Sequence, residues 1–143
     1  MIGQVFLTVL SGVGVFVIGQ IFVKFVIEPI QEFYKLTGQI GHSLIYYANV
    51  YSNTEVSPEP ELKAAQETFR QHACDLHLRA HTIPLYGLWA RIRLLPPRTN
   101  ANAAGSNLIG LSNGVYDKSA KAGEMNDKSR QRIEALLNLK TGE

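Results

Sequence analysis

Residues 2–23, IGQVFLTVLSGVGVFVIGQIFV, contain no Asp, Glu, Lys or Arg. Lys24 is the first charged side chain, so all 14 basic and 12 acidic residues of the 143-residue chain lie from Lys24 onward. As an α-helix, residues 2–23 would span ~33 Å, which is about the thickness of a bilayer's hydrocarbon core. The sequence therefore predicts a membrane-spanning helix and argues against a uniformly soluble domain.

The flanks of this stretch predict its fate and orientation. It lacks the positively charged start and the small-residue cleavage site of a secretory signal peptide, so we expect an uncleaved anchor at residues 1–28. Every basic residue follows the apolar stretch, and the positive-inside rule then places the N-terminus outside and a helical domain, residues 29–143, in the cytoplasm. The predicted location is the cell inner membrane, with lipid as a partner. The alternative is a buried helix of a soluble protein, for which a charge-free run of this length is unusual.

One face of the predicted span carries small and polar residues. Thr8, Gly12 and Gly19 share a helical face, and small residues on such a face let two membrane helices approach closely. Gln4 and Gln20 add side-chain amides, which need hydrogen-bond partners in an apolar medium. The pattern predicts a homo-oligomer, with a polar lining if several copies form a ring. The alternative is that glycine is simply common in membrane helices.

Beyond the anchor, apolar residues recur at three- and four-residue steps, and no convincing strand alternation is present. Two of these apolar stripes are predicted to face the core: Leu62, Ala65, Phe69, Ala73, Leu76, Ala80 and Ile83, and then Ala101, Ala104, Leu108, Leu111 and Val115. The sequence therefore predicts an all-α fold, in which the transmembrane helix continues through a kink at Pro29 into a small cytoplasmic helical bundle. The expected helices are residues 30–51, 58–82 with Ser57 as N-cap, a short helix after Pro84, a helix capped by Thr99 or Asn100 that extends to Val115, and residues 127–140; the expected loops are residues 52–60 and 117–126.

Composition and motifs exclude several classes of function. The net charge of +2 and the lack of a basic run make nucleic acid an unlikely partner. A single cysteine, Cys74, rules out a disulfide framework and suits a reducing compartment. No phosphate-binding loop, zinc-protease motif or EF-hand loop is present, and no cofactor is expected. Residues 110–114 match G-x-S-x-G, but their helical context lacks the strand that a nucleophile elbow requires.

The most suggestive cluster is RQHACDLHLRAH, residues 70–81, where Arg70, Cys74, His77 and His81 form one stripe of a helix. Three interpretations remain open. Cys74, His77 and His81 would be ligands of a metal ion. Arg70 and His77 match the loose Arg-x(4–6)-His pattern of HEPN ribonucleases, in which a histidine moves a proton and an arginine stabilises phosphorane charge. The third interpretation is a polar face between helices or subunits.

Three segments carry a resemblance to known proteins: residues 25–51, FVIEPIQEFYKLTGQIGHSLIYYANVY, residues 79–100, RAHTIPLYGLWARIRLLPPRTN, and residues 107–116, NLIGLSNGVY. Together they resemble a widespread group of bacterial single-pass membrane proteins. In overall plan the chain is also similar to the membrane accessory protein of type VI-B CRISPR systems, which forms a ring-shaped pore in antiphage defence. The positions that match its Arg…His motif are Arg70 and His77.

The expected function is that of a non-enzymatic, homo-oligomeric inner-membrane protein whose ring or pore perturbs the membrane in antiphage defence, as the second resemblance implies. Two alternatives stay open. One is a membrane-tethered ribonuclease or metal-binding enzyme that uses Arg70, His77 and His81. The other is a membrane scaffold that recruits a cytosolic protein partner.

Overall fold

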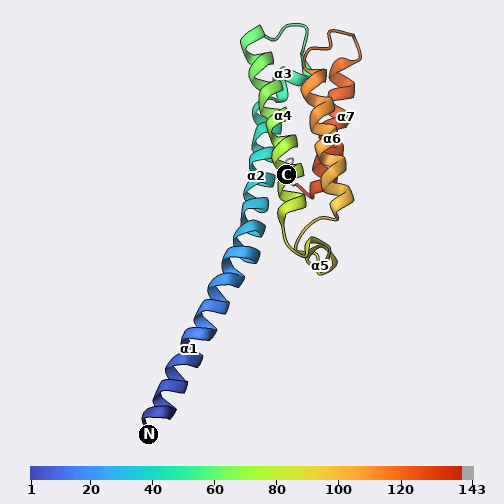
Figure 1. Cartoon of the computed structure of the whole chain (residues 1–143). Coiled ribbons are helices and arrows are strands. Elements are labelled where there is room, and N and C mark those ends of the chain that lie inside the picture. Colours follow the sequence, from blue (N-terminus) through green and yellow to red (C-terminus); the bar gives the residue numbers. More distant parts are fainter. Residues whose placement is uncertain (140–143) are drawn as a thin grey trace.

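A single helical rod forms the N-terminal third of the chain in the computed structural model, which describes residues 1–139 (Figure 1). The rod comprises α1 (Ile2–Phe22), the π-helical turn η1 (Val23–Ile27) and α2 (Glu28–Tyr46). These 45 residues are one continuous helix, about 67 Å long at 1.5 Å per residue. The predicted continuity of the anchor with the next helix is confirmed.

The π-helical turn η1 explains how the helix passes Pro29. Proline has no N–H to donate, and its ring clashes with the carbonyl four residues earlier, here that of Phe25. A turn with wider hydrogen bonding, residues Val23–Ile27, directly precedes α2 and takes up this distortion. In place of the predicted kink at Pro29, the structure has a widened turn with a gentle bend, and the helix does not break (Figure 1).

The remaining helices pack beside α2 as an antiparallel bundle, while α1 extends away from it (Figure 1). Helix α4 packs against both α2 and α6, and α6 packs against α7. No strand occurs within residues 1–139, so the predicted all-α fold is confirmed. The elements after the rod are α3 (Ala48–Ser52), α4 (Glu59–Thr82), α5 (Tyr86–Arg91), α6 (Arg98–Gly114) and α7 (Ala122–Leu137).

The core of the bundle is made by the apolar stripes that the sequence predicts. Helix α2 contributes Phe33, Ile40 and Leu44, which are at most 1% exposed. Helices α4 and α6 face them with the complete predicted stripes, and Ile133 and Leu137 of α7 close the core. The buried stripe residues of α4 and α6 are Leu62, Ala65, Phe69, Ala73, Leu76, Ala80, Ala101, Ala104, Leu108 and Leu111, followed by Ile83 and Val115 just beyond the helices.

The predicted helix starts were wrong at three places. Helix α4 begins at Glu59 after Pro58, and the Ser57 hydroxyl donates to the Asn53 carbonyl at 2.9 Å instead of capping the helix. Helix α6 begins at Arg98 after Pro97, with no side-chain cap. At both sites the proline, with its fixed φ and an extended ψ, ends the loop. Helix α7 begins at Ala122, five residues before the predicted start, and the predicted end at residue 140 lies outside the described residues.

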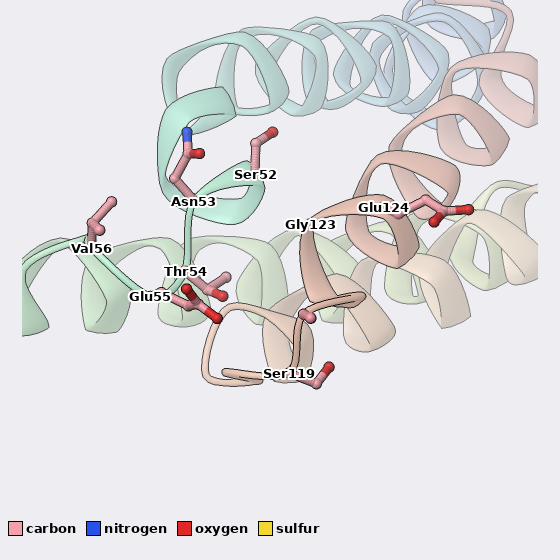
Figure 2. A pocket seen from close by; sticks show the side chains of 9 residues that line it. Ser52, Asn53, Thr54, Glu55, Val56, Ser119, Gly123 and Glu124 are labelled. Atoms are coloured by element: carbon pink, nitrogen blue, oxygen red, sulfur yellow. The ribbon is translucent and has the colours of Figure 1, made fainter.

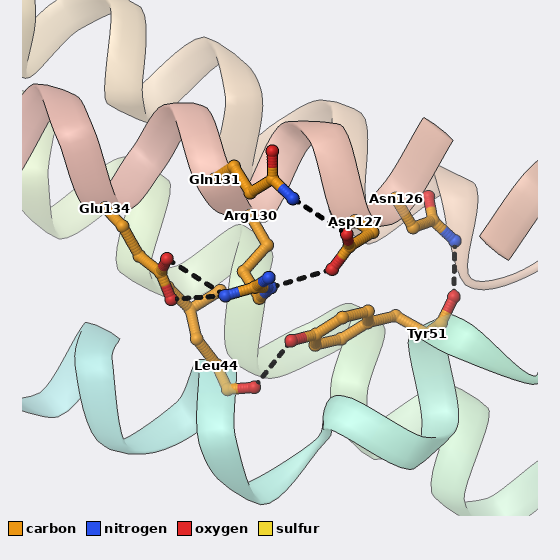
Figure 3. A network of polar contacts seen from close by, with 7 residues as sticks. All are labelled: Leu44, Tyr51, Asn126, Asp127, Arg130, Gln131 and Glu134. Carbon is orange, nitrogen blue, oxygen red and sulfur yellow. Dashed lines mark hydrogen bonds and ion pairs between the residues drawn. The ribbon is translucent and has the colours of Figure 1, made fainter. Parts of the chain in front are cut away.

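A buried polar contact fastens α3 to the other helices. The Asn126 amide, on α7, donates to the carbonyl oxygen of Tyr51 at 2.9 Å, and the Tyr51 hydroxyl donates to the Leu44 carbonyl at 2.8 Å (Figure 3). The same amide also donates to the carbonyl oxygen of Gly114 at 3.0 Å. Burial raises the pKa of Tyr51 to about 12, so the hydroxyl stays protonated and keeps donating. This contact interrupts the predicted helix 30–51 at Tyr47 and turns α3 toward α7.

Candidate membrane interface

Helix α1 exposes every large apolar side chain that it carries. Thirteen such residues lie between Ile2 and Phe22, each at least 47% exposed, and none of the helix is buried by the bundle. Within residues 1–139 it belongs to the single helix that is long and apolar enough to cross a bilayer, with a mean hydropathy of 2.2 over the best 18 residues. The rest of the chain has a closed core, so α1 presents an apolar surface that the protein itself does not cover.

The small-residue face of α1 is open. A Cβ added at Gly12 or Gly19 would meet no atom within 4 Å, and the Thr8 hydroxyl is satisfied within the helix by the Gln4 carbonyl at 2.9 Å. The side-chain amides of Gln4 and Gln20 have no hydrogen-bond partner among residues 1–139. The geometry leaves room for another helix on this face, and self-association stays a prediction.

The stripe at residues 70–81 is exposed on α4, because it lies on a different side of this helix from the buried core residues. Arg70 donates from Nη2 to Asn113 Oδ1 of α6 at 2.8 Å, and no contact joins it to His77. The His77 and His81 rings lie 4.2 Å apart, and the His81 Nδ1 is 2.9 Å from the His77 carbonyl oxygen. The structure therefore brings the two histidines together and uses Arg70 to join two helices.

Metal binding by this stripe finds no support in the geometry. Among residues 1–139, no group of three or more His, Cys, Asp or Glu side chains is arranged to hold a metal ion. Cys74 is exposed on the stripe without joining the histidine pair in such a group. A zinc site needs four ligands, or three and a water. Of the three interpretations of the stripe, the polar face between helices is the one that fits the hydrogen bond from Arg70 to Asn113.

His72, a possible fourth ligand of the predicted metal site, instead makes a contact between helices that the sequence did not predict. Its Nε2 lies 2.8 Å from the Ser43 hydroxyl of α2, while its Nδ1 is buried and has no partner among residues 1–139. Burial lowers the pKa of His72, and the nearby Asp75 opposes the shift. His72 thus joins α4 to α2 as a neutral ring. Local sequence patterns could not predict this contact, because Ser43 and His72 are 29 residues apart and meet only in the folded bundle.

A polar pocket lies at the end of the bundle that is remote from α1, between the loop after α3 and the start of α7 (Figure 2). It is lined by small and polar residues, and its two carboxylates come from Glu55 and Glu124. A hydrogen bond from Lys128 at 2.7 Å lowers the pKa of Glu124, which therefore stays ionised. No cysteine or histidine lines this pocket, and its Thr54 hydroxyl donates to the Asp117 carbonyl at 2.6 Å.

Ser112 of the G-x-S-x-G fragment has no catalytic geometry. It is fully buried inside α6, and its hydroxyl donates to the Ile109 carbonyl at 2.7 Å. A nucleophile elbow needs an exposed serine on a strand-to-helix turn. The interpretation of this fragment as a coincidence is confirmed.

Comparisons with protein-family models, curated proteins and solved structures find no match to this chain. The function must therefore be argued from the geometry of the chain itself.

Proposed function

We propose that the chain is a single-pass inner-membrane protein that self-associates through α1 and holds its helical bundle at the cytoplasmic surface. The observation that carries the proposal is the exposure of α1, whose thirteen large apolar side chains are all uncovered. Burial of such a side chain contributes about 1.5–3 kcal/mol, so covering the whole helix amounts to on the order of 20 kcal/mol or more. That exceeds the total stability of a typical domain, about 5–15 kcal/mol. A bilayer provides the required apolar surroundings.

The proposed orientation rests on the charges that follow the apolar helix. Lys24 and Lys35 are the first two basic residues of the sequence, and both follow the apolar helix. Basic residues beside a span are retained on the cytoplasmic side. The bundle would then lie in the cytoplasm, with the N-terminus outside.

The only cysteine of the chain offers a direct test of this topology. Cys74 is exposed on α4, in the domain that we place in the cytoplasm. A membrane-impermeant maleimide should label Cys74 in inverted vesicles and leave it unlabelled in intact spheroplasts, and a Cys74→Ser variant measures the background. Labelling in spheroplasts would reverse the orientation, and extraction of the protein by alkaline carbonate would refute membrane insertion.

Self-association is supported by the open face of Gly12 and Gly19, where a second backbone can approach, and by the unpartnered amide of Gln20 within the apolar segment. We expect native mass spectrometry in detergent to show an oligomer for the wild type and monomers for Gly12→Leu/Gly19→Leu. The control is Gly3→Leu/Gly14→Leu, which adds the same bulk away from this face, since a Cβ at either glycine also meets no atom within 4 Å. A wild-type monomer, or an equal loss of assembly in the control, would contradict this interface.

A pore that acts in antiphage defence is the finer form of the proposal, and its support is the resemblance in overall plan. Expression of the wild type should depolarise the inner membrane, as read by a potential-sensitive dye, and Gly12→Leu/Gly19→Leu should not. If the oligomer forms but the membrane potential is unchanged with and without phage, the pore is refuted and the oligomeric anchor stands.

A further inference from the structure

The segment between α4 and α6 carries several apolar side chains that are exposed and do not belong to the core of the bundle. Residues 84–95, PLYGLWARIRLL, contain α5, and we call this segment the elbow. Four of its aliphatic side chains are uncovered: Leu85 is 68% exposed, Leu88 50%, Ile92 55% and Leu94 42%. A group of exposed aliphatic residues in one short segment is a typical mark of an interaction surface.

The elbow also lies in the most one-sided charge segment of the chain. Residues 76–116 contain four arginines and no acidic residue. Two of these arginines have internal roles: Arg79 pairs with Glu32 at 3.4 Å, and the Arg98 guanidinium lies 5.0 Å from the centre of the Tyr86 ring. Arg91 and Arg93 are exposed and form no ion pair or side-chain hydrogen bond among residues 1–139. The elbow therefore combines uncovered apolar groups with two uncompensated positive charges.

Internal contacts hold the elbow in this shape. The Trp89 indole N–H donates to the Pro84 carbonyl at 2.9 Å, and the buried Tyr86 hydroxyl donates to the Pro96 carbonyl at 2.7 Å. The Tyr34 hydroxyl of α2 donates to the Leu94 carbonyl. Because its backbone is tied at these points, the elbow keeps the four exposed aliphatic side chains outside the core, while Leu95 is buried in it.

The same contacts fix the height of the elbow above the predicted span. Its Tyr86 ring lies 6.2 Å from the Phe33 ring of α2. Phe33 is six residues beyond Ile27, the last residue of η1, a rise of ~9 Å. The headgroup layer on one side of a bilayer is about 5–8 Å thick. Tyr86 thus lies just above the headgroup layer, and the elbow stands at the end of the bundle from which α1 extends (Figure 1), so it is the part of the bundle that comes closest to the predicted membrane surface.

We propose that the elbow is a second membrane contact, in which Leu85, Leu88, Ile92 and Leu94 enter the interface of an anionic bilayer while Arg91 and Arg93 bind its phosphate groups. The proposal rests on the membrane insertion of α1. Arginine and aliphatic residues beside a tryptophan are the composition of interfacial segments. An anionic lipid surface fits better than a protein partner because the elbow lies at the end of the bundle from which α1 extends (Figure 1) and because its charged side chains are all positive.

The only tryptophan of the chain makes the test direct, since Trp89 lies in the middle of the elbow. The full chain is reconstituted into vesicles of phosphatidylglycerol and phosphatidylcholine whose acyl chains are brominated near the headgroup, and the fluorescence of Trp89 is measured. We expect quenching of at least twofold for the wild type. Leu88→Asp/Ile92→Asp should lose most of the quenching, and so should Arg91→Glu/Arg93→Glu, which leaves the apolar residues in place. Val56→Asp is the matched control, because Val56 is 81% exposed at the remote end of the bundle.

Flotation of the vesicles separates the two proposals. If the wild type does not float with them, the insertion of α1 fails; if it floats but bromine does not quench Trp89, the elbow proposal is overturned. Equal quenching in vesicles of phosphatidylcholine alone would overturn the role of the arginines. Trp89 that is shielded from both brominated lipid and aqueous acrylamide would mean that a second copy covers the elbow, which also overturns the proposal. Circular dichroism checks that each variant is folded.

Discussion

Alanine at position 114 should destabilise this protein, although alanine in place of glycine ordinarily stabilises a helix by about 0.5–1 kcal/mol. A Cβ on Gly114 would lie 1.9 Å from Oδ1 of Asn126 and 2.9 Å from its Cγ. The Asn126 side chain is buried and donates to two carbonyl groups, one of them that of Tyr51 (Figure 3), so it cannot move aside without breaking these bonds.

The magnitude follows from the hydrogen bonds of Asn126. Each of the two bonds contributes about 1 kcal/mol, and a buried carbonyl that loses its partner adds a penalty of about 1–3 kcal/mol. The Gly114 carbonyl also accepts from the Asp117 N–H at 3.1 Å, so the penalty falls mainly on the carbonyl of Tyr51. We expect Asn126→Ala to cost about 3–5 kcal/mol, a fall of roughly 12–20 °C in Tm for a domain of this size. Gly114→Ala alone should cost slightly less, because the helix gains from alanine.

The decisive comparison is the double variant, measured by thermal unfolding of the full chain in detergent with circular dichroism. In the Asn126→Ala background the obstructing side chain is gone, so Gly114→Ala should become stabilising by about 0.5–1 kcal/mol. Gly110→Ala is the control, because a Cβ at Gly110 of the same helix meets no atom within 4 Å and should stabilise in both backgrounds. An equal loss from Gly114→Ala in both backgrounds would refute the clash with Asn126.

Three further predictions concern other parts of the bundle. Gly123→Ala should lower the stability by about 1–3 kcal/mol in urea unfolding, because its Cβ would lie 2.5 Å from the backbone oxygen of Ser52. Leu85→Gly should raise the stability by up to about 1 kcal/mol, since Leu85 has a left-handed φ of 55° and an exposed side chain. Burial lowers the pKa of His72, so the unfolded chain binds the proton more tightly than the folded chain; the Tm should therefore fall as the pH drops below 6.5, and His72→Gln should reduce this dependence.

Each of these predictions has a contrary result. A neutral Gly123→Ala would mean that α3 shifts away from α7 at no cost. A loss of stability in Leu85→Gly would show that the exposed side chain packs more tightly than its 68% exposure implies. An unchanged pH profile in His72→Gln would assign any acid destabilisation to other groups.

The helices and the core were predictable because apolar spacing reports burial directly. Every predicted stripe residue of α4 and α6 is buried, from Leu62 to Ile83 and from Ala101 to Val115. The start of α7 was not predictable from local pattern, since residues 122–126, AGEMN, carry little apolar signal. That turn is held by contacts distant in sequence, such as the bond from Asn126 to Tyr51, 75 residues away.

The candidate site was predictable in its anchor and not in its elbow. The absence of charge before Lys24 is a local property, and it predicts the exposed apolar helix directly. The elbow depends on the path of the chain: α4 runs back toward α1, so α5 returns to the end of the bundle from which α1 extends (Figure 1). The charge pattern held a usable signal, because no acidic residue lies between Asp75 and Asp117.

The helix that joins anchor and bundle has a mechanical consequence, because it is continuous from Ile2 to Tyr46 through the widened turn η1. Where it tilts as one body, a helix of about 67 Å converts a change of 5° in its tilt into a displacement of about 6 Å at its upper end. Membrane helices tilt more in a thinner bilayer. In the proposed topology, the thickness of the lipid layer therefore sets the angle at which the bundle leans over the surface, and α1 and α2 together act as a lever that turns a property of the membrane into a position in the cytoplasm.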